Sequence, residues 1–429
     1  MINYLFLAII LFLPLQFALN VGENIDLVTT RIFVPVIFLL WLARSLAQKK
    51  IWISNKAEMW IAATFLFLSL SSLFLGRDAG EGIRKFVYFL TIFPVFFVAA
   101  DIFQAQKWRE KTIAAIVFSG ILAAAIGLFQ FALSFFIGVD KSVRIWENLA
   151  PFFLGNSFGK IVAANSSWLV NIGGETRMRA FGFFPDPHNF AFFVNLCLFS
   201  GLGYMFFQKK NAVKIWIGAA LVLMAVAVGI SFSRGAYLGL IAGVVFFTII
   251  FLKRTGILGK ALVAAGALFV IMFIFNSNII SQRLASSFNL KEGSNAERYK
   301  NWVQAADIIQ EYPLGGVGLG NYARTVDPRL GGANRSSIYA HNLFLDIAAE
   351  TGILNAVLFL LLIFFSIWRN VKNNNMMSLG LASGLVAFSV HSVFDTALYC
   401  PQVLLMFLII IALGLYNPKI QNSNAKITA

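Results

Sequence analysis

Runs of apolar residues, each long enough to cross the roughly 30 Å hydrocarbon core of a bilayer, recur along almost the whole chain. Short polar stretches separate these runs, so the pattern predicts an all-α polytopic membrane protein in which each run forms a helix. We expect about twelve spans, at residues 1–19, 27–48, 58–76, 83–101, 112–138, 187–207, 213–231, 235–252, 258–276, 343–368, 377–398 and 401–416. The first run lacks a preceding positive charge and a following cleavage site, so we expect a retained helix and not a cleaved signal peptide.

Lysine and arginine are concentrated in every second loop, which predicts the orientation of the chain because such loops stay in the cytoplasm. This alternation places both termini in the cytoplasm and puts two large loops, at about 139–186 and 277–342, on the external face. The chain then divides into nine helices with the first large loop (1–276), an external loop domain (277–342), three helices (343–416) and a cytoplasmic tail (417–429).

Composition agrees with a membrane location and argues against several other classes of protein. Of the 429 residues, 59% are hydrophobic and 12% are charged, against about 25% charged residues in a typical soluble domain. The net charge of +15 follows largely from the cytoplasmic loops, so it does not indicate binding to nucleic acid. Cys197 and Cys400 fall in or beside apolar runs, which favours buried thiols over a disulfide. The three histidines form no metal-binding motif with cysteine or aspartate, so we expect neither a metal nor another cofactor.

The second large loop contains a clear helix signal. Ser294-Asn295-Ala296-Glu297 fits a capping box, and Pro313 with the glycines after it ends the pattern. Between these limits, Arg298, Trp302, Ala305 and Ile309 lie on one stripe at helical spacing. An amphipathic helix along the membrane face would bury Arg298 against the transmembrane bundle.

Two arginines and one histidine fall on the predicted external face beside apolar helices, where ionisable groups often serve a function. Arg234 occupies a turn between two spans, where the alternative to a site role is an interfacial arginine reaching lipid phosphate. The glycines that follow it, Gly235 and Gly239, are spaced for close helix packing. Arg298 could instead form a structural ion pair, for example with Glu297 or Glu350. His341 begins His341-Asn342, which fits either a helix cap or a general base.

Further candidates lie at the external ends of predicted spans. His391 and Asp395 are four residues apart and share a helical face, either as a structural polar pair or as part of an acceptor site. Arg177, Arg179 and His188 precede or begin the sixth span, where they could contact glycan or phosphate or simply belong to the turn around Pro185 and Pro187. The Arg84-Lys85 pair at the start of the fourth span has the position of interfacial cations.

These residues resemble a known family. His341-Asn342, followed after nine residues by Gly352-Ile353-Leu354-Asn355, is similar to the His-Asn-x9-Gly-x-x-Gly signature of O-antigen ligases, although Asn355 replaces its last glycine. The Ser-Arg-Gly turn at 233–235 and the run from Arg298 to Gly320 resemble the wider superfamily of O-antigen ligases and polymerases. The resemblance covers roughly residues 180–400.

The resemblance implies an inverting glycosyltransferase of the GT-C type in the bacterial cytoplasmic membrane, which works without a metal. It would transfer a glycan from an undecaprenyl-diphosphate carrier to a glycan, lipid or protein acceptor. By the resemblance, Arg234 and Arg298 would hold the diphosphate, and His341 would activate the acceptor hydroxyl or assist the departure of the phosphate. From their positions in the sequence we also expect substrate contacts from Asn342, Arg177, Arg179, His188, His391 and Asp395. Fixed arginines suit a diphosphate leaving group because they are always charged and make bidentate contacts.

Several alternatives remain open at this stage. A ligase, a repeat-unit polymerase and a protein O-oligosaccharyltransferase share one catalytic core, and the His-Asn signature favours the ligase. A flippase for lipid-linked oligosaccharides would carry its key cations within central spans and have short loops. A non-catalytic scaffold would not need Arg234, Arg298 and His341 to converge. The long loop at 277–342 with its predicted helix favours an enzyme over a flippase.

Overall fold

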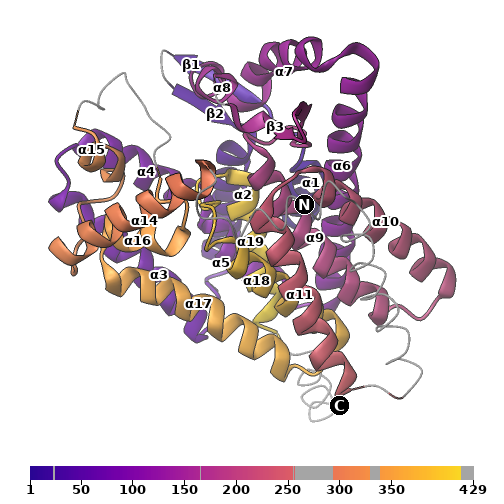
Figure 1. Cartoon of the computed structure of the whole chain (residues 1–429). Helices are drawn as coiled ribbons and strands as arrows, with labels where there is room; N and C mark the ends of the chain where they lie inside the picture. The colour runs from indigo at the N-terminus through magenta and orange to yellow at the C-terminus, as the bar shows by residue number, and fades with distance from the viewer. Residues whose placement is uncertain (23–24, 165, 255, 257–292, 329–338, 417–429) are drawn as a thin grey trace, which may run out of the picture.

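The computed structural model describes residues 1–22, 25–164, 166–254, 256, 293–328 and 339–416 and shows a mostly helical molecule (Figure 1). Two antiparallel hairpins are formed by β1 (Ala18–Gly22) with β2 (Ile25–Val28) and by β3 (Leu169–Ile172) with β4 (Glu175–Met178). The α-helices are α1 (Ile2–Phe12), α2 (Thr29–Ala47), α3 (Ala57–Ser71), α4 (Ala79–Ile92), α5 (Pro94–Ile102), α6 (Gln106–Ile137), α7 (Val139–Leu154), α8 (Asn156–Ala163), α9 (Pro187–Phe207), α10 (Asn211–Ile230), α11 (Arg234–Leu252), α14 (Gly293–Glu311), α15 (Tyr322–Val326), α16 (Leu343–Thr351), α17 (Ile353–Lys372), α18 (Met376–His391) and α19 (Pro401–Gly414). The 3-10 helices are η1 (Ser72–Leu75) and η2 (Ser166–Trp168).

Within these described ranges, eight helical segments are long and apolar enough to cross a membrane. They are Thr29–Ala47, Ala57–Leu75, Ala79–Ile102, Gln106–Ile137, Pro187–Phe207, Asn211–Ile230, Arg234–Leu252 and Ile353–Lys372. Shorter apolar helices, α1, α18 and α19, fall within three further predicted spans. The predicted ninth span at 258–276 lies outside the described residues. The chain is therefore a multi-pass membrane protein of helical type.

Two of the described spans are each divided into two α-helices. The run 83–101 is divided at Phe93 into α4 and α5, which together remain long enough to cross a membrane, whereas the prediction for 343–368 is wrong as a single helix. The apolar run 343–368 is divided at Gly352 into α16 and α17, and only α17 has the length and composition of a membrane helix. Gly352 adopts a φ of 89°, a left-handed value that glycine accepts without strain. The backbone N–H of Ile353 then donates to the carbonyl of Pro313 at 2.9 Å, which holds the loop after α14 against this break.

The bundle core is built around α9, which packs against α6, α10 and α18, while α11 packs against α18. Glycines allow these close approaches, as the spacing of Gly235 and Gly239 predicts. A Cβ at Gly239 would lie 2.6 Å from the Ala387 carbonyl oxygen, and one at Gly235 would lie 2.7 Å from Cδ2 of His391. The start of α11 and the end of α18 therefore meet at the same end of the bundle.

The two predicted loops contain defined structure. Residues 139–186 form α7, α8 and the second hairpin, and these elements gather with the first hairpin at one end of the molecule in Figure 1. In the second loop, the predicted amphipathic helix is confirmed as α14, which packs against α16. Its Ala305 is fully buried, and Trp302 and Ile309 are partly buried, so the predicted stripe faces the protein. The side chain of Ser294, half of the predicted capping box, lies outside the described part.

Candidate active site

A single buried carboxylate gathers the candidate residues. Asp395 follows the end of α18 and is 4% exposed. Its two oxygens lie 3.2 and 3.3 Å from Nη2 of Arg298, which comes from α14. Nδ1 of His341 lies 3.4 Å away, and Nδ1 of His188 lies 2.9 Å away. Three cationic or protonatable side chains from three separate segments therefore meet on one aspartate.

Arg234 lies beside this group. It is the first residue of α11, where the hydroxyl of Ser233 caps the helix by accepting from the Ala236 N–H. The guanidinium is buried and donates from Nη1 to the side-chain oxygen of Asn295 at 2.8 Å. Asn295 precedes Arg298 by three residues, so the Arg234 guanidinium contacts the same first turns of α14 that carry Arg298. The predicted convergence of Arg234, Arg298 and His341 is therefore present in the structure.

A second set of contacts centres on the hydroxyl of Ser233, the residue before Arg234. The Ser233 hydroxyl lies 2.9 Å from Nδ1 of His188 and 3.3 Å from Nε2 of His391. His391 is fully buried and stacks on Phe192 with ring centroids 3.5 Å apart. As the sequence predicts, His391 lies near Asp395, at 3.9 Å between Nε2 and Oδ2. Its burial gives His391 the position of a support for Ser233 and Asp395, away from a substrate surface.

The two arginines of the β4 region have different environments. Arg179 is buried, donates from Nε to the Ser231 carbonyl at 2.8 Å, and places Nη2 3.5 Å from His188. Arg179 therefore joins the turn before α11 to the start of α9. Arg177 lies on β4, has a side chain that is 30% exposed, and pairs with Glu175 at 2.7 Å. The structure brings Arg179 and His188 into the network but directs the Arg177 guanidinium to Glu175.

His341 has a constrained backbone and an accessible ring. Its φ of 52° is a left-handed value that a residue with a Cβ adopts only when its surroundings enforce it. Asn342 caps α16 by accepting from the Phe344 and Leu345 N–H groups, as its predicted cap role requires. The imidazole side chain is 41% exposed, with Nδ1 turned toward Asp395. Burial lowers the pKa of His341, but the hydrogen bond and charge of Asp395 outweigh that effect and raise it above its ordinary value.

The electrostatics of this end of the bundle favour an anion. Three helices begin at this end of the bundle. α9 begins next to His188, α11 begins at Arg234, and α16 begins directly after its cap Asn342. Helix N-termini carry partial positive charge and bind phosphate groups well. Arg298 pairs with Asp395, Arg234 donates to Asn295 and Arg179 lies beside His188, so three guanidinium groups lie at this end of the bundle.

The structure corrects one predicted pairing and one predicted position. Arg298 pairs with Asp395, whereas the sequence offered Glu297 or Glu350 as its structural partner. Glu350 instead binds Lys85, whose Nζ lies 2.6 Å from Oε2, and both side chains are largely buried. Lys85 is therefore not the interfacial cation expected from its position at the start of the fourth span. Its ammonium lies 3.8 Å from the ring centroid of Tyr399, which adds a cation–π contact.

One group of residues has the composition of a metal site. The ligand atoms of His188, His391 and Asp395 lie within 4.8 Å of one another, and the sequence did not predict this cluster because His188 is distant in the chain from the His391–Asp395 pair. Both oxygens of Asp395 already accept from Arg298, and His188 is shared between Asp395 and Ser233. A divalent ion would have to displace these bonds beside two arginines, so the charge distribution suits an anion better than a cation.

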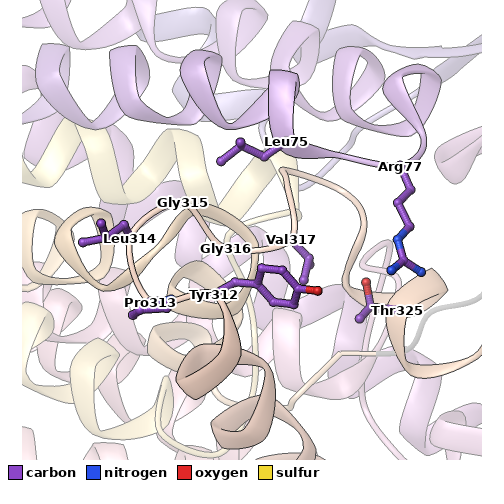
Figure 2. Close-up of a pocket in the computed structure, with 9 residues that line it drawn as sticks. All are labelled: Leu75, Arg77, Tyr312, Pro313, Leu314, Gly315, Gly316, Val317 and Thr325. Carbon is purple, nitrogen blue, oxygen red and sulfur yellow. The ribbon is translucent and has the colours of Figure 1, made fainter.

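A cleft of about 430 Å³ lies outside this network (Figure 2). It is lined by Leu75, Arg77, Tyr312, the loop from Pro313 to Val317, and Thr325. In Figure 2, the Arg77 side chain extends toward Thr325 at one side of the cleft, and Leu75 lies above the glycine loop. The backbone N–H of Val317 donates to the Ala349 carbonyl at 2.9 Å, so the cleft is connected to α16 but shares no lining residue with the Asp395 network.

Comparisons with known proteins agree with this arrangement. Residues 219–360 match the family model described as O-Antigen ligase, a region that contains Arg234, Arg298 and His341. A general O-oligosaccharyltransferase of Acinetobacter baylyi is 25% identical over 378 residues, which cover 80% of this chain and 62% of the relative. The matched part of this chain thus spans less than two thirds of that relative. These matches confirm the resemblance to O-antigen ligases, which is carried by residues 219–360.

Proposed function

We propose that this protein transfers a glycan from an undecaprenyl-diphosphate carrier to an acceptor hydroxyl on the external face of the bacterial cytoplasmic membrane. The observation that carries the proposal is the meeting of Arg298 and His341 on Asp395, with Arg234 one helical turn away on Asn295. In this account, the Asp395 network is the active site of a GT-C-type enzyme with both termini in the cytoplasm.

Arg234 and Arg298 bind the diphosphate of the donor, assisted by the N-terminus of α11. As the bond between the anomeric carbon and the phosphate oxygen breaks, negative charge accumulates on the departing lipid diphosphate. Two fixed guanidinium groups stabilise that charge, and each well-placed donor can contribute about 3–4 kcal/mol. The arginines therefore take the part that a divalent ion has in many nucleotide-sugar enzymes, and the reaction proceeds without a metal.

His341 acts on the acceptor. With Nδ1 held by Asp395, its other ring nitrogen accepts the proton of the acceptor hydroxyl while the oxygen attacks the anomeric carbon from the side opposite the diphosphate. The new glycosidic bond then has inverted configuration. Asp395 keeps the ring in one orientation and stabilises the imidazolium that forms, as a carboxylate does beside a catalytic histidine.

The acceptor hydroxyl can come from either of two classes of molecule. The His-Asn signature and the O-antigen ligase family region favour a saccharide or lipid acceptor, as in a ligase or a repeat-unit polymerase. The relative from Acinetobacter baylyi is described as a general O-oligosaccharyltransferase, which favours serine or threonine hydroxyls of a protein. Both classes present a hydroxyl to the same base, so the catalytic account is common to them.

A transfer assay with purified protein tests the proposal. The protein in detergent or nanodiscs is incubated with an undecaprenyl-diphosphate oligosaccharide, a chelator and three acceptors, namely a lipid-linked saccharide, a second donor molecule and a serine-rich protein. We expect a new glycosidic bond on one acceptor and loss of product in the His341→Ala variant. Movement of the donor across a bilayer without bond formation would instead identify a flippase and refute the proposal.

A further inference from the structure

One buried carboxylate outside the network contacts the neighbours of both His341 and Asp395. Asp346 lies in the first turns of α16 and is 1% exposed. Its Oδ1 accepts from the backbone N–H of Ala340 at 2.7 Å, and its Oδ2 accepts from the hydroxyl of Thr396. Ala340 directly precedes His341, and Thr396 directly follows Asp395. A single side chain therefore joins the two segments that carry the proposed base and its carboxylate partner.

We propose that Asp346 is a positioning residue, which sets the distance between His341 and Asp395 and never touches the substrate. The inference rests on the proposed function, because the geometry that Asp346 fixes is that of the proposed base. The proposed function by itself gives no role to Asp346, which lies in the apolar stretch after His341-Asn342.

The backbone around His341 explains why such a residue is needed. A left-handed φ of 52° at a residue with a side chain persists only if contacts on both sides hold it. On one side, Asp346 fixes the N–H of Ala340. On the other side, Asn342 caps α16, and the N–H of Leu343 donates to the Ser392 carbonyl at 2.9 Å. Without Asp346 the first of these restraints is lost, and the imidazole is free to turn away from Asp395.

Asp395 also depends on neighbouring contacts to hold its position. It lies in the irregular segment between α18 and α19, where its N–H donates to the His391 carbonyl at 3.2 Å. The hydroxyl of Thr396 is the next side-chain anchor, and Asp346 is the acceptor for it. Loss of Asp346 therefore loosens both partners of the His341–Asp395 contact at once.

The surroundings of Asp346 set the conditions for a test. Burial raises the pKa of Asp346 to about 6, with opposing contributions from its bonds to Thr396 and Ala340, a further increase from Glu350, and a decrease from Lys85. Tyr322, Tyr339 and Tyr399 also face this region, and their pKa values lie above the ordinary range because of burial and the nearby carboxylates. At pH 8 Asp346 is ionised and these three phenols are neutral. Measurements at that pH therefore compare the variants with a single charge state of the natural protein.

The test combines Asp346→Ala, Asp346→Asn and Thr396→Val with Thr64→Val as a matched control. Thr64 is exposed and donates to the Trp60 carbonyl of its own helix, so its loss changes no contact of the network. Asparagine keeps the shape of Asp346 and one strong acceptor. We expect kcat at pH 8 to fall roughly 100-fold in Asp346→Ala, as for a misplaced catalytic group, with the donor KM nearly unchanged. Asp346→Asn should recover most of the activity, Thr396→Val should show an intermediate loss, and Thr64→Val should match the natural protein.

A second readout does not depend on transfer. The chain has three histidines, and His341 has the most exposed side chain, so diethyl pyrocarbonate labelling with peptide mapping follows its titration directly. We expect the pKa of His341 to fall in Asp346→Ala and in Thr396→Val, because the imidazole separates from Asp395. An unchanged His341 titration, or an unchanged kcat in Asp346→Ala, would overturn the inference. If the natural protein labels as expected but transfers no glycan, the proposed function fails while the positioning role stands. If Asp346→Ala does not fold, Thr396→Val and Asp346→Asn decide the question by the same two readouts.

Discussion

The imidazole of His341 lies 3.4 Å from the carboxylate of Asp395, although the two residues are separated in the chain by the whole of α16, α17 and α18. The contact forms because the break at Gly352 turns the chain into α17, and α18 returns it to the same end of the bundle. The same carboxylate accepts from Arg298 of α14. A base and an anion-binding cation therefore share one partner, which couples the acceptor side of the site to the donor side.

The first prediction concerns the pH dependence of activity. His341 must be neutral to accept a proton, and its raised pKa places the acidic limb of the kcat/KM profile above the ordinary histidine value of about 6.5. The change Asp395→Asn removes the charge that raises this pKa, so the acidic limb should move to lower pH while the maximal rate falls about 100-fold or more. Rate measurements from pH 5 to pH 9 test this.

The stability of the fold should fall as pH rises through the pKa of His341, whereas activity should rise. Because the folded protein raises the pKa of His341, the contact with Asp395 stabilises the fold fully below the unfolded pKa and loses that contribution as pH rises through the folded pKa. Asp307→Asn, at an exposed residue of α14, is the matched control for Asp395→Asn. It should change neither the pH profile of kcat/KM nor the pH profile of stability. An acidic limb that stays in place in Asp395→Asn would contradict the assignment of His341.

The second prediction separates charge from geometry at the diphosphate site. Arg298→Gln and Arg234→Gln should each reduce kcat by about 100- to 1000-fold, because a stabilising donor is lost from the departing diphosphate. Lysine at either position restores charge without the bidentate fork, so Arg298→Lys and Arg234→Lys should recover activity only in part. Steady-state kinetics with varied donor concentration measure the effect. Arg84→Gln, at an exposed arginine paired with Glu81, is the matched control, and a comparable loss in that variant would point to a general surface effect.

The third prediction concerns the buried ion pair between Lys85 and Glu350. Removing one partner leaves a charge buried without compensation, so Glu350→Gln should lower the free energy of unfolding by about 3–5 kcal/mol. The double variant Lys85→Met/Glu350→Leu removes both charges and should be less destabilised than either single variant. Thermal unfolding in detergent at fixed pH gives the comparison. Additive losses in the double variant would mean that the two side chains contribute independently.

The fourth prediction concerns metals. Because the residues around Asp395 are matched to an anion, transfer should proceed at an unchanged rate in excess chelator. Added zinc should inhibit by competing for His188, His391 and Asp395, whose ligand atoms lie within 4.8 Å of one another. Loss of activity in chelator, with recovery on addition of magnesium or manganese, would contradict the proposal that the arginines stabilise the diphosphate in place of a metal.

Much of the fold could be predicted because membrane helices leave a strong signal in hydropathy. The helix at 293–311 was also predictable, since Arg298, Trp302 and Ala305 repeat at helical spacing beside cap and stop residues. The division of residues 343–368 was not, because a single glycine in an apolar run does not reveal that Gly352 takes a left-handed φ. That conformation depends on the approach of the Pro313 loop, which is a tertiary contact.

The candidate site was predictable in its main residues but not in their pairing. Arg234, Arg298 and His341 stand out because ionisable groups beside apolar helices are rare. Which carboxylate meets Arg298 depends on how α14 lies across the bundle, and sequence spacing suggested Glu297 or Glu350 in place of Asp395. Asp346 had a usable signal, an acidic residue within an apolar run directly after His341-Asn342, and it was missed. Asn295 had none, since it appears in the sequence only as part of a cap.

Equilibrium binding of an undecaprenyl-diphosphate donor to the purified protein tests the central claim most directly. The account predicts that Arg234→Ala and Arg298→Ala each weaken binding at least about tenfold, equivalent to about 1.4 kcal/mol. His341→Ala should bind the donor nearly as well as the natural protein and yet fail to transfer the glycan. Unchanged donor affinity in both arginine variants would contradict the claim that these residues and His341 form one diphosphate-binding active site.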